Sequence, residues 1–183
     1  MTRLRVRVAL CLLGTAAPLP VLAQGERVAT HLVTTNAIVI ARPAAVVWPY
    51  IMEPGSWKQG NRLVHQAGPR GRTGERFAAV SAARPDRPDY FVENVEVTPP
   101  ERRVIKLYAP DGTLIGFAAF VLTESGGSTT VRYDVYTETV ISAAERARTT
   151  PAARAVAERA DREASRRRFD AELQALKRLV EGS

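Results

Sequence analysis

Along most of the chain, apolar and polar residues alternate with the period of two that half-buried β-strands require. The pattern is clearest over residues 129–139, where Val131, Tyr133 and Val135 alternate with polar or charged neighbours. One side of such a strand should be buried and the other should face water. On this basis the sequence predicts seven strands, over residues 31–41, 62–66, 75–83, 90–97, 103–108, 114–123 and 129–139.

Short segments rich in glycine, proline, serine and aspartate separate the last six predicted strands. Pro110-Asp111-Gly112 and Ser125-Gly126-Gly127-Ser128 are typical hairpin turns, because these residues accept the backbone angles of tight turns. Residues 68–74 form a longer glycine-rich loop, which we expect to be flexible. Connections this short favour antiparallel pairing, so the strands should form an antiparallel meander.

A helical pattern occupies the C-terminal end of the chain. Thr150 followed by Pro151 is a typical helix start. Four apolar residues then share one narrow face of the helix, namely Phe169, Leu173, Leu176 and Val180. An alanine stripe at positions 153, 157, 160 and 164 lies roughly opposite and buries little area, so only the last three turns should enter the core. A narrow apolar stripe needs a cover, and we expect the sheet to curve around it.

A short helix pair is predicted after the first strand. Pro43 suits the first helical turn, and the apolar run at residues 44–52 supplies a side that can face the core. Pro49 should bend this helix or split it, and Pro54 should end it. A second short helix or turn should follow around Trp57, which we expect to fix the pair against the sheet.

The first 23 residues have the organisation of a secretory signal peptide. Arg3, Arg5 and Arg7 precede an apolar run over residues 8–21, and Ala23 is the small residue before a cleavage site. We therefore expect export to the periplasm or the medium, with residues 24–183 forming one domain; an uncleaved N-terminal anchor is the alternative. Cleavage would remove three arginines and the one cysteine, which lowers the net charge from +7 to +4.

The remaining positive charge gathers on the C-terminal helix, around Arg166, Arg167 and Arg168. A basic helix face is usually a solvated surface, and contact with an anionic membrane surface is the alternative that we retain. Basic residues are not interleaved with aromatic ones, so the sequence predicts no nucleic-acid partner.

Several local motifs occur in an order that is similar to one known superfamily. Residues 38–57 combine the end of a strand, a helix that begins with proline and a Pro-Gly-Ser-Trp segment. Residues 97–102 contain a Pro-Pro turn, and residues 125–128 and 173–179 form a closing hairpin turn and helix. Together they resemble the SRPBCC superfamily, which includes START and pollen-allergen-like proteins and the polyketide cyclase/dehydrase and lipid-transport group.

This resemblance covers residues 34–181 and implies a helix-grip fold of the α+β class. In that fold a seven-stranded curved antiparallel sheet surrounds a long C-terminal helix, with a short helix pair after the first strand. Members of the superfamily bind lipids, sterols, polyketides or other apolar molecules in the cavity between sheet and helix, and a minority catalyse reactions there. The superfamily has no universal catalytic motif, so the resemblance transfers no catalytic residue to this chain.

The sequence offers few groups for catalysis or for a cofactor. His31 and His65 are its only histidines, and neither has the spacing to acidic residues that a metal site needs. No serine-nucleophile motif occurs, and we expect no cofactor or metal. Candidate acids and bases are His65, Tyr133 and an inward-facing Glu93. Each also has a structural interpretation: a rim histidine, a core tyrosine, and a carboxylate that a strand bulge turns outward.

Small side chains on the strand at residues 114–123 should leave room for a ligand. Gly116 and Ala118 share one face and Ala119 lies on the other, so space remains whichever face turns inward. We expect an apolar cavity that opens near residues 68–74, and large side chains at Gly116 or Ala118 should block it. The candidate lining residues are His65, Phe77, Glu93, Gly116, Ala118, Tyr133, Phe169, Leu173 and Leu176.

Three functions are compatible with these features. The first is an exported, non-enzymatic binder or carrier of an apolar small molecule or lipid. The second is a cyclase, dehydratase or hydrolase that uses His65, Tyr133 or Glu93, and the third is a protein-interaction module with a filled cavity. Clustering of those three residues in one cavity would favour the enzyme. A dry pocket without them would favour the carrier, and the absence of a pocket would favour the interaction module.

Overall fold

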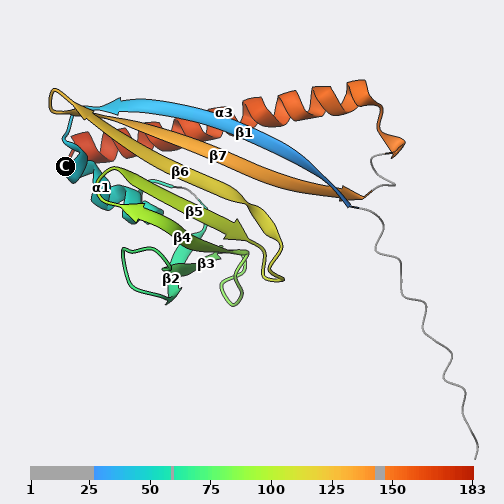
Figure 1. The fold of residues 1–183 in the computed structure, drawn as a ribbon, viewed down its shortest axis with the longest axis horizontal. Coiled ribbons are helices and arrows are strands. Elements are labelled where there is room, and N and C mark those ends of the chain that lie inside the picture. The colour runs from blue at the N-terminus through green and yellow to red at the C-terminus, as the bar shows by residue number, and fades with distance from the viewer. Residues whose placement is uncertain (1–26, 59, 143–146) are drawn as a thin grey trace, which may run out of the picture.

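The structure is a computed structural model that describes residues 27–58, 60–142 and 147–183 (Figure 1). The predicted signal peptide and its cleavage site lie outside these residues. The elements follow in the order β1 (Arg27–Ile40), α1 (Ala44–Met52), η1 (Pro54–Ser56), β2 (Arg62–Ala67), β3 (Arg76–Val80), β4 (Tyr90–Thr98), β5 (Arg102–Tyr108), β6 (Leu114–Ser125), β7 (Ser128–Ser142) and α3 (Pro151–Glu181).

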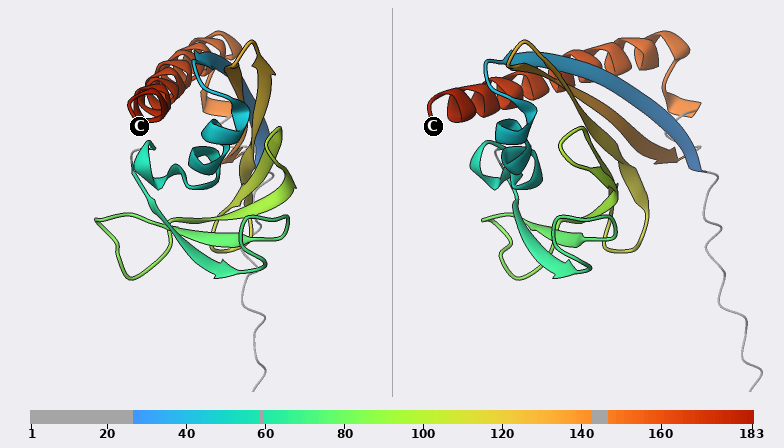
Figure 2. Two further views of the ribbon diagram at one scale, coloured as in Figure 1. Left: turned by 90° about the vertical axis from the view of Figure 1, so that its left-hand side faces the viewer. Right: turned by 60° about the vertical axis from the view of Figure 1, so that its left-hand side comes forward.

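The seven strands form one antiparallel sheet in the order β1-β7-β6-β5-β4-β3-β2. From β2 to β7, strands that are consecutive in the chain lie side by side, as the short turns predict. β1 instead pairs with β7, from Arg27↔Ser142 to Ile40↔Thr129. The sheet is strongly curved, and its concave side holds α3 together with α1 (Figures 1 and 2). The predicted α+β helix-grip fold is confirmed.

The strand predicted over residues 75–83 is shorter in the structure. β3 covers only Arg76–Val80, because the chain turns directly afterwards. The Arg84 N–H donates a 3.2 Å hydrogen bond to the Ser81 carbonyl, which fixes that turn. β1 is longer than predicted and begins at Arg27, since it pairs with β7 along its whole length.

The helix pair consists of α1 and the single 3₁₀ turn η1. Pro49 was predicted to bend the helix or to split it, and the split does not occur. Pro49 is exposed, and its carbonyl accepts a 3.0 Å hydrogen bond from the Glu53 N–H, so the helix continues past the missing donor. Trp57 is buried, as expected, and its indole N–H donates to the Tyr50 carbonyl at 2.7 Å.

α3 is continuous, and the Thr150 hydroxyl caps its start by accepting a 3.2 Å hydrogen bond from the Ala153 N–H. The prediction that only its last turns enter the core is confirmed, since the alanine stripe is exposed. The buried residues of α3 are Phe169, Leu173, Leu176 and Val180. In the described part of the chain, no helix offers the apolar length that a bilayer crossing needs.

Polar contacts fasten α3 to β1. The Asn36 side-chain amide donates to Oδ1 of Asp170 and, at 3.1 Å, to the Arg166 carbonyl. One turn before the end of the helix, Lys177 Nζ donates to the Val39 carbonyl at 2.6 Å. These bonds pair the amide nitrogen of the buried Asn36 and hold the helix against β1, which is an edge strand of the sheet.

Candidate functional site

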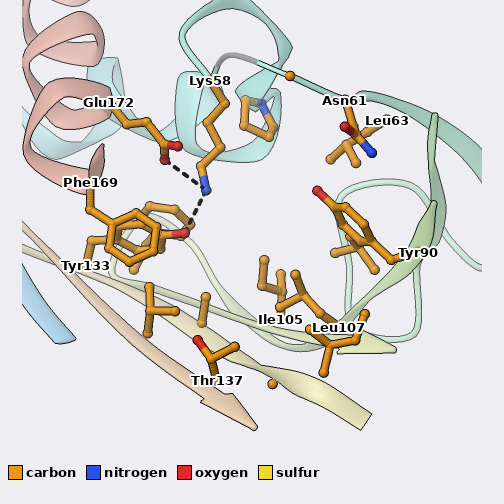
Figure 3. Close-up of a pocket in the computed structure, with 18 of the residues that line it drawn as sticks. Lys58, Asn61, Leu63, Tyr90, Ile105, Leu107, Tyr133, Thr137, Phe169 and Glu172 are labelled. Carbon is orange, nitrogen blue, oxygen red and sulfur yellow. Dashed lines mark hydrogen bonds and ion pairs between the residues drawn. The ribbon is translucent and has the colours of Figure 1, made fainter. Parts of the chain in front are cut away.

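The concave side of the sheet borders a cavity of about 500 Å³. Strands β4 to β7 form its floor, the segment after α1 forms a wall, and Phe169 and Glu172 reach it from α3 (Figure 3). The volume lies within the roughly 300–1,000 Å³ that is typical of small-molecule sites. The apolar lining residues are Leu63, Val92, Ile105, Leu107, Ile115, Ala118, Phe120, Val135 and Phe169.

Three polar side chains meet where α3 borders this cavity. Lys58 Nζ donates a 2.7 Å hydrogen bond to the Tyr133 hydroxyl and lies 3.6 Å from Oε2 of Glu172 (Figure 3). Lys58 follows η1, Tyr133 lies in β7 and Glu172 lies in α3, so the fold brings together residues that are distant in sequence. The side chains of Lys58 and Glu172 are only 25% and 14% exposed, so water screens their attraction incompletely.

Aromatic packing holds this polar cluster in place. Phe120 and Tyr133 are directly opposed on β6 and β7, and their rings stack with centroids 4.3 Å apart. Phe169 from α3 meets the Tyr133 ring edge-on at 5.1 Å. Lys58 Nζ lies 4.5 Å from the centroid of the Tyr133 ring, which is within cation–π range.

Tyr90 from β4 faces the cluster across the cavity (Figure 3). Burial raises the pKa of its hydroxyl, an effect that the positive charge of Lys58 partly offsets. The hydroxyl therefore stays protonated at neutral pH and is a hydrogen-bond donor for the cavity.

Arg103 from β5 is a fully buried cation in the cavity wall. Its Nε donates a 2.9 Å hydrogen bond to Oδ1 of Asn94, and its Nη1 donates to the Ile51 carbonyl in α1. Asn94 in turn donates to Oε2 of Glu75 at 3.3 Å. Burial lowers the pKa of Arg103 to about 10, although the negative charge of Glu75 acts to raise it. The guanidinium is therefore still charged at neutral pH.

The site is suited to holding a polar group next to an apolar body. Lys58 and Tyr90 can donate hydrogen bonds, and Oε2 of Glu172 is a buried acceptor without a hydrogen-bond partner among the described residues. Residues 27–58, 60–142 and 147–183 contain no group of three or more His, Cys, Asp or Glu side chains that could hold a metal ion.

The structure brings some of the predicted site residues to the cavity. Four of the nine line it, namely Gly116, Ala118, Tyr133 and Phe169. Phe77, Leu173 and Leu176 instead pack into the hydrophobic core, and none of these three lines the cavity. α3 turns Arg168, Phe169 and Glu172 toward the cavity. The last turns of the helix contribute to the core, where α1 also packs.

His65 and Glu93 do not line the cavity, contrary to the prediction. Val92 and Asn94 are the buried residues of this part of β4, so Glu93 lies on the opposite face of the strand. His65 packs edge-on against Phe77 with ring centroids 6.2 Å apart, and its Nε2 is 3.9 Å from a carboxylate oxygen of Glu75. His65, Tyr133 and Glu93 therefore do not form one cluster.

None of residues 68–74 lines the cavity, so the lining gives no support to the expected opening near this loop. The backbone of this loop is tied to buried polar groups of the sheet. The Gly71 N–H donates to Oε2 of Glu75 at 2.7 Å, and the Gly74 N–H donates to the Asn94 carbonyl at the same distance. Gly68 is required because the loop is tight, since a Cβ at this position would lie 2.2 Å from the Gly74 carbonyl oxygen.

The sequence interpretation missed most of the polar lining residues, among them Lys58, Tyr90, Arg103 and Glu172. Lys58 follows a turn, where no hydrophobic period assigns a direction to a side chain. Arg103 did carry a usable signal, because it alternates in phase with Ile105 and Leu107 on a predicted strand. An arginine on an otherwise apolar strand face is a buried charge that needs partners.

Comparison with known proteins identifies the family. Residues 31–181 match the family described as polyketide cyclase / dehydrase and lipid transport. The chain belongs to this family. The match covers β2 to β7 and α3 completely, and therefore every lining residue of the cavity in this polyketide cyclase/dehydrase family protein. The family fold indicates binding of a hydrophobic ligand. No match is found among curated protein sequences.

Solved structures of low sequence identity have a similar fold. Staphylococcus aureus SA2116, of unknown function, gives a TM-score of 0.67 at 10% identity over 84% of this chain and 96% of that chain. A norcoclaurine synthase point mutant from Thalictrum flavum, in complex with a transition-state analogue, gives a TM-score of 0.54 at 13% identity. That similarity covers 84% of this chain and 96% of the synthase chain. The di-domain ARO/CYC protein BexL of the BE-7585A biosynthetic pathway gives a TM-score of 0.57 at 19% identity. That similarity covers 80% of this chain and 49% of the BexL chain. At these identities the similarity shows the fold alone.

Proposed function

We propose that this family member binds an apolar small molecule or lipid with one polar end, and that it acts as a carrier. The observation that supports this best is the combination of an apolar cavity of about 500 Å³ with the Lys58–Tyr133–Glu172 cluster beside it. Burial of apolar ligand surface would contribute roughly 25 cal/mol per Å² before the costs of association. The polar cluster would then fix the orientation of the ligand.

An enzymatic role is the second candidate, and the same cluster favours it. Lys58 connects the Tyr133 hydroxyl to the Glu172 carboxylate, and such groups can transfer a proton to or from a bound substrate. The norcoclaurine synthase and the ARO/CYC protein show that enzymes are found among proteins of similar fold. We rank the carrier first because His65 and Glu93, two of the three expected acids and bases, lie away from the cavity.

Native mass spectrometry of the protein purified from its own host tests the two candidates directly. A carrier should release, on denaturation, a molecule whose mass is unchanged after prolonged incubation with the protein. Conversion of the released molecule into a second mass would instead support the enzyme.

Blocking the cavity tests whether it is the binding site. Ala118 is buried and lines the cavity, so Ala118→Trp should fill the space and weaken binding of the neutral probe N-phenyl-1-naphthylamine at least tenfold. Ala119→Trp, on the opposite face of β6, is the matched control and should bind like the parent. If Ala118→Trp folds and binds the probe as tightly as the parent, the cavity is not the site.

We also propose that the protein works outside the cytoplasm, on the basis of the signal-peptide pattern at residues 1–23. N-terminal sequencing of the protein from its host should begin at Gln24, and a protein that retains Met1 would contradict cleavage. Contact of Arg166, Arg167 and Arg168 with an anionic membrane stays a prediction. Cosedimentation with phosphatidylglycerol vesicles, compared with neutral vesicles, would test it.

A further inference from the structure

Arg103 leaves one buried hydrogen-bond donor without a partner at the cavity wall. The side chain is 1% exposed, and its Nη2 has no hydrogen-bond partner among the described residues. Asn94 and the carbonyls of Ile51 and Met52 engage only Nε and Nη1. Buried polar groups are nearly always paired, because an unpaired one loses its hydration without compensation. An acceptor supplied by a ligand would complete this guanidinium.

The lining of the cavity carries more positive than negative charge. Its cations are Lys58, Arg103 and Arg168, and Glu172 is the one carboxylate among the described lining residues. Glu75 lies behind Asn94 and offsets part of the Arg103 charge from outside the cavity. A positive potential therefore remains, and the apolar walls strengthen it by lowering the local dielectric constant.

Donors also exceed acceptors around Tyr133. Lys58 Nζ carries three hydrogens and donates one of them to the Tyr133 hydroxyl. Tyr90 presents its protonated hydroxyl from the opposite side of the cavity. Oε2 of Glu172 is the competing acceptor, but it already lies 3.6 Å from Lys58. A ligand group that accepts several hydrogen bonds and carries negative charge matches this set better than a neutral hydroxyl does.

We propose that the ligand is an amphipathic acid whose carboxylate lies near Tyr133, in the positive field of Lys58 and Arg103. Its apolar body would lie along the side chains that β4 and β5 present to the cavity, such as Val92, Ile105 and Leu107. This inference rests on the proposed function and adds the charge and chemical class of the ligand. A long-chain fatty acid and a compact aromatic acid share this chemistry, and the two series of ligands below distinguish them.

Displacement of N-phenyl-1-naphthylamine by matched acid and alcohol pairs tests the charge of the ligand. Dodecanoate is compared with 1-dodecanol, and 2-naphthoate with 2-naphthalenemethanol. In at least one series the parent should bind the acid about tenfold more tightly than the alcohol, as expected for a hydrogen bond to a charged group. The series with the larger preference indicates the shape of the ligand body.

Variants then assign the preference to the cavity. Lys58→Met removes a partly exposed charge but keeps the packed stem, and it should bring the ratio of acid to alcohol affinity close to one by weakening the acid more than the alcohol. Lys106→Met is the control, because Lys106 does not line the cavity, and it should keep the full preference. Arg103→Lys should also reduce the preference, although it risks the buried network around Asn94.

The outcomes separate the two proposals. Equal binding of acid and alcohol by the parent, or an unchanged preference in a folded Lys58→Met protein, overturns the acid ligand while leaving the apolar cavity in place. Failure of the parent to bind the probe and every acid and alcohol overturns the proposed function itself.

Discussion

Tyr133 belongs to the core and to the cavity at the same time. Its ring is 3% exposed and packs between Phe120 and Phe169, while its hydroxyl accepts a hydrogen bond from Lys58. The aromatic packing therefore fixes the position of the Tyr133 hydroxyl. The hydrogen bond to that hydroxyl in turn restrains the ammonium group of the flexible Lys58 side chain. A single residue of β7 couples the stability of the sheet to the geometry of the candidate site.

Gly116 is required by the approach of two strands, and a substitution there should act on the sheet. A Cβ at this position would lie 2.0 Å from the Tyr136 carbonyl oxygen in β7. Gly116→Ala should therefore lower the free energy of unfolding by about 1–3 kcal/mol in urea denaturation. Large side chains at Gly116 would disrupt the sheet, which corrects the expectation that they would simply block the cavity.

Gly55 provides the matched control for this prediction. It also lines the cavity, but a Cβ there would meet no atom within 4 Å, and its φ is not positive. Gly55→Ala should leave the urea midpoint close to that of the parent. Equal midpoints for Gly116→Ala and Gly55→Ala would show that β7 yields to the added methyl group.

At the residue scale, alternation predicted the inward direction of Tyr133 but not the residue that it contacts. The inward direction of Tyr133 followed from its phase with Val131 and Val135. Its partner Lys58 lies in an irregular segment, 75 residues earlier in the chain, and no local pattern connects the two. Contacts of this kind depend on how distant elements are placed, and a sequence pattern does not contain that information.

At the element scale, α3 separates into an exposed part and a buried part. Leu176 is fully buried, whereas Ala157 is exposed on the earlier turns. Leu176→Ala should lower the free energy of unfolding by roughly 2–5 kcal/mol, because it empties part of the contact between helix and sheet. Ala157→Ser should change it by less than about 0.5 kcal/mol. Equal losses in chemical denaturation would show that the early turns are also buried.

The end of α3 makes a connection to the β1–α1 link that depends on pH. The Ala41 N–H and Lys177 Nζ each donate a 2.7 Å hydrogen bond to the Glu181 carboxylate, and they hold its pKa below the usual 4.5. Because the folded pKa is the lower one, this stabilisation is present above about pH 4.5 and is lost as the pH falls through the folded value.

Glu181→Gln should therefore be less stable than the parent near neutral pH, and the difference should shrink as the pH falls below 4.5 and through the lower folded pKa of Glu181. Thermal unfolding measured across this range checks the prediction. Glu163→Gln is the control, because Glu163 is well exposed and lies 4.0 Å from Arg167. A stability gap that stays constant with pH would show that the carboxylate charge of Glu181 is not responsible.

Elements were predictable where the hydrophobic period is long and regular. The phase of Phe169, Leu173, Leu176 and Val180 correctly assigned the buried turns of α3. β4 was harder, because Phe91, Glu93 and Val95 alternate as plausibly as Tyr90, Val92 and Asn94, and the structure buries Val92 and Asn94. A bulge between Asn94 and Glu96 then changes the register, and local residue preferences do not reveal it.

At the scale of the whole molecule, the chain places its first two strands at opposite edges of the sheet. The order of turns predicted the meander from β2 to β7, and the family resemblance supplied the curved sheet around the helix. The pairing of β1 with β7 was not predicted. Volume and lining of the cavity were less accessible, since they depend on the curvature of the sheet and on how α1 and α3 share its concave side. The space left by Ala118 was foreseen, while the charged groups around it were not.

The strand pairs of this sheet differ greatly in length, and that difference has a consequence for how a ligand enters. β3 pairs with β4 only from Arg76↔Glu93 to Ala79↔Tyr90, whereas β1 and β7 are paired over their whole lengths. Backbone amides of β2 and β3 should therefore exchange with deuterium sooner than those of β6 and β7, because a short edge hairpin detaches at low cost. Leu63 in β2 and Tyr90 at the start of β4 line the cavity, so detachment of this hairpin would open it. A bound ligand should then slow deuterium uptake selectively in β2 and β3, and uniform slowing across the sheet would point to another route.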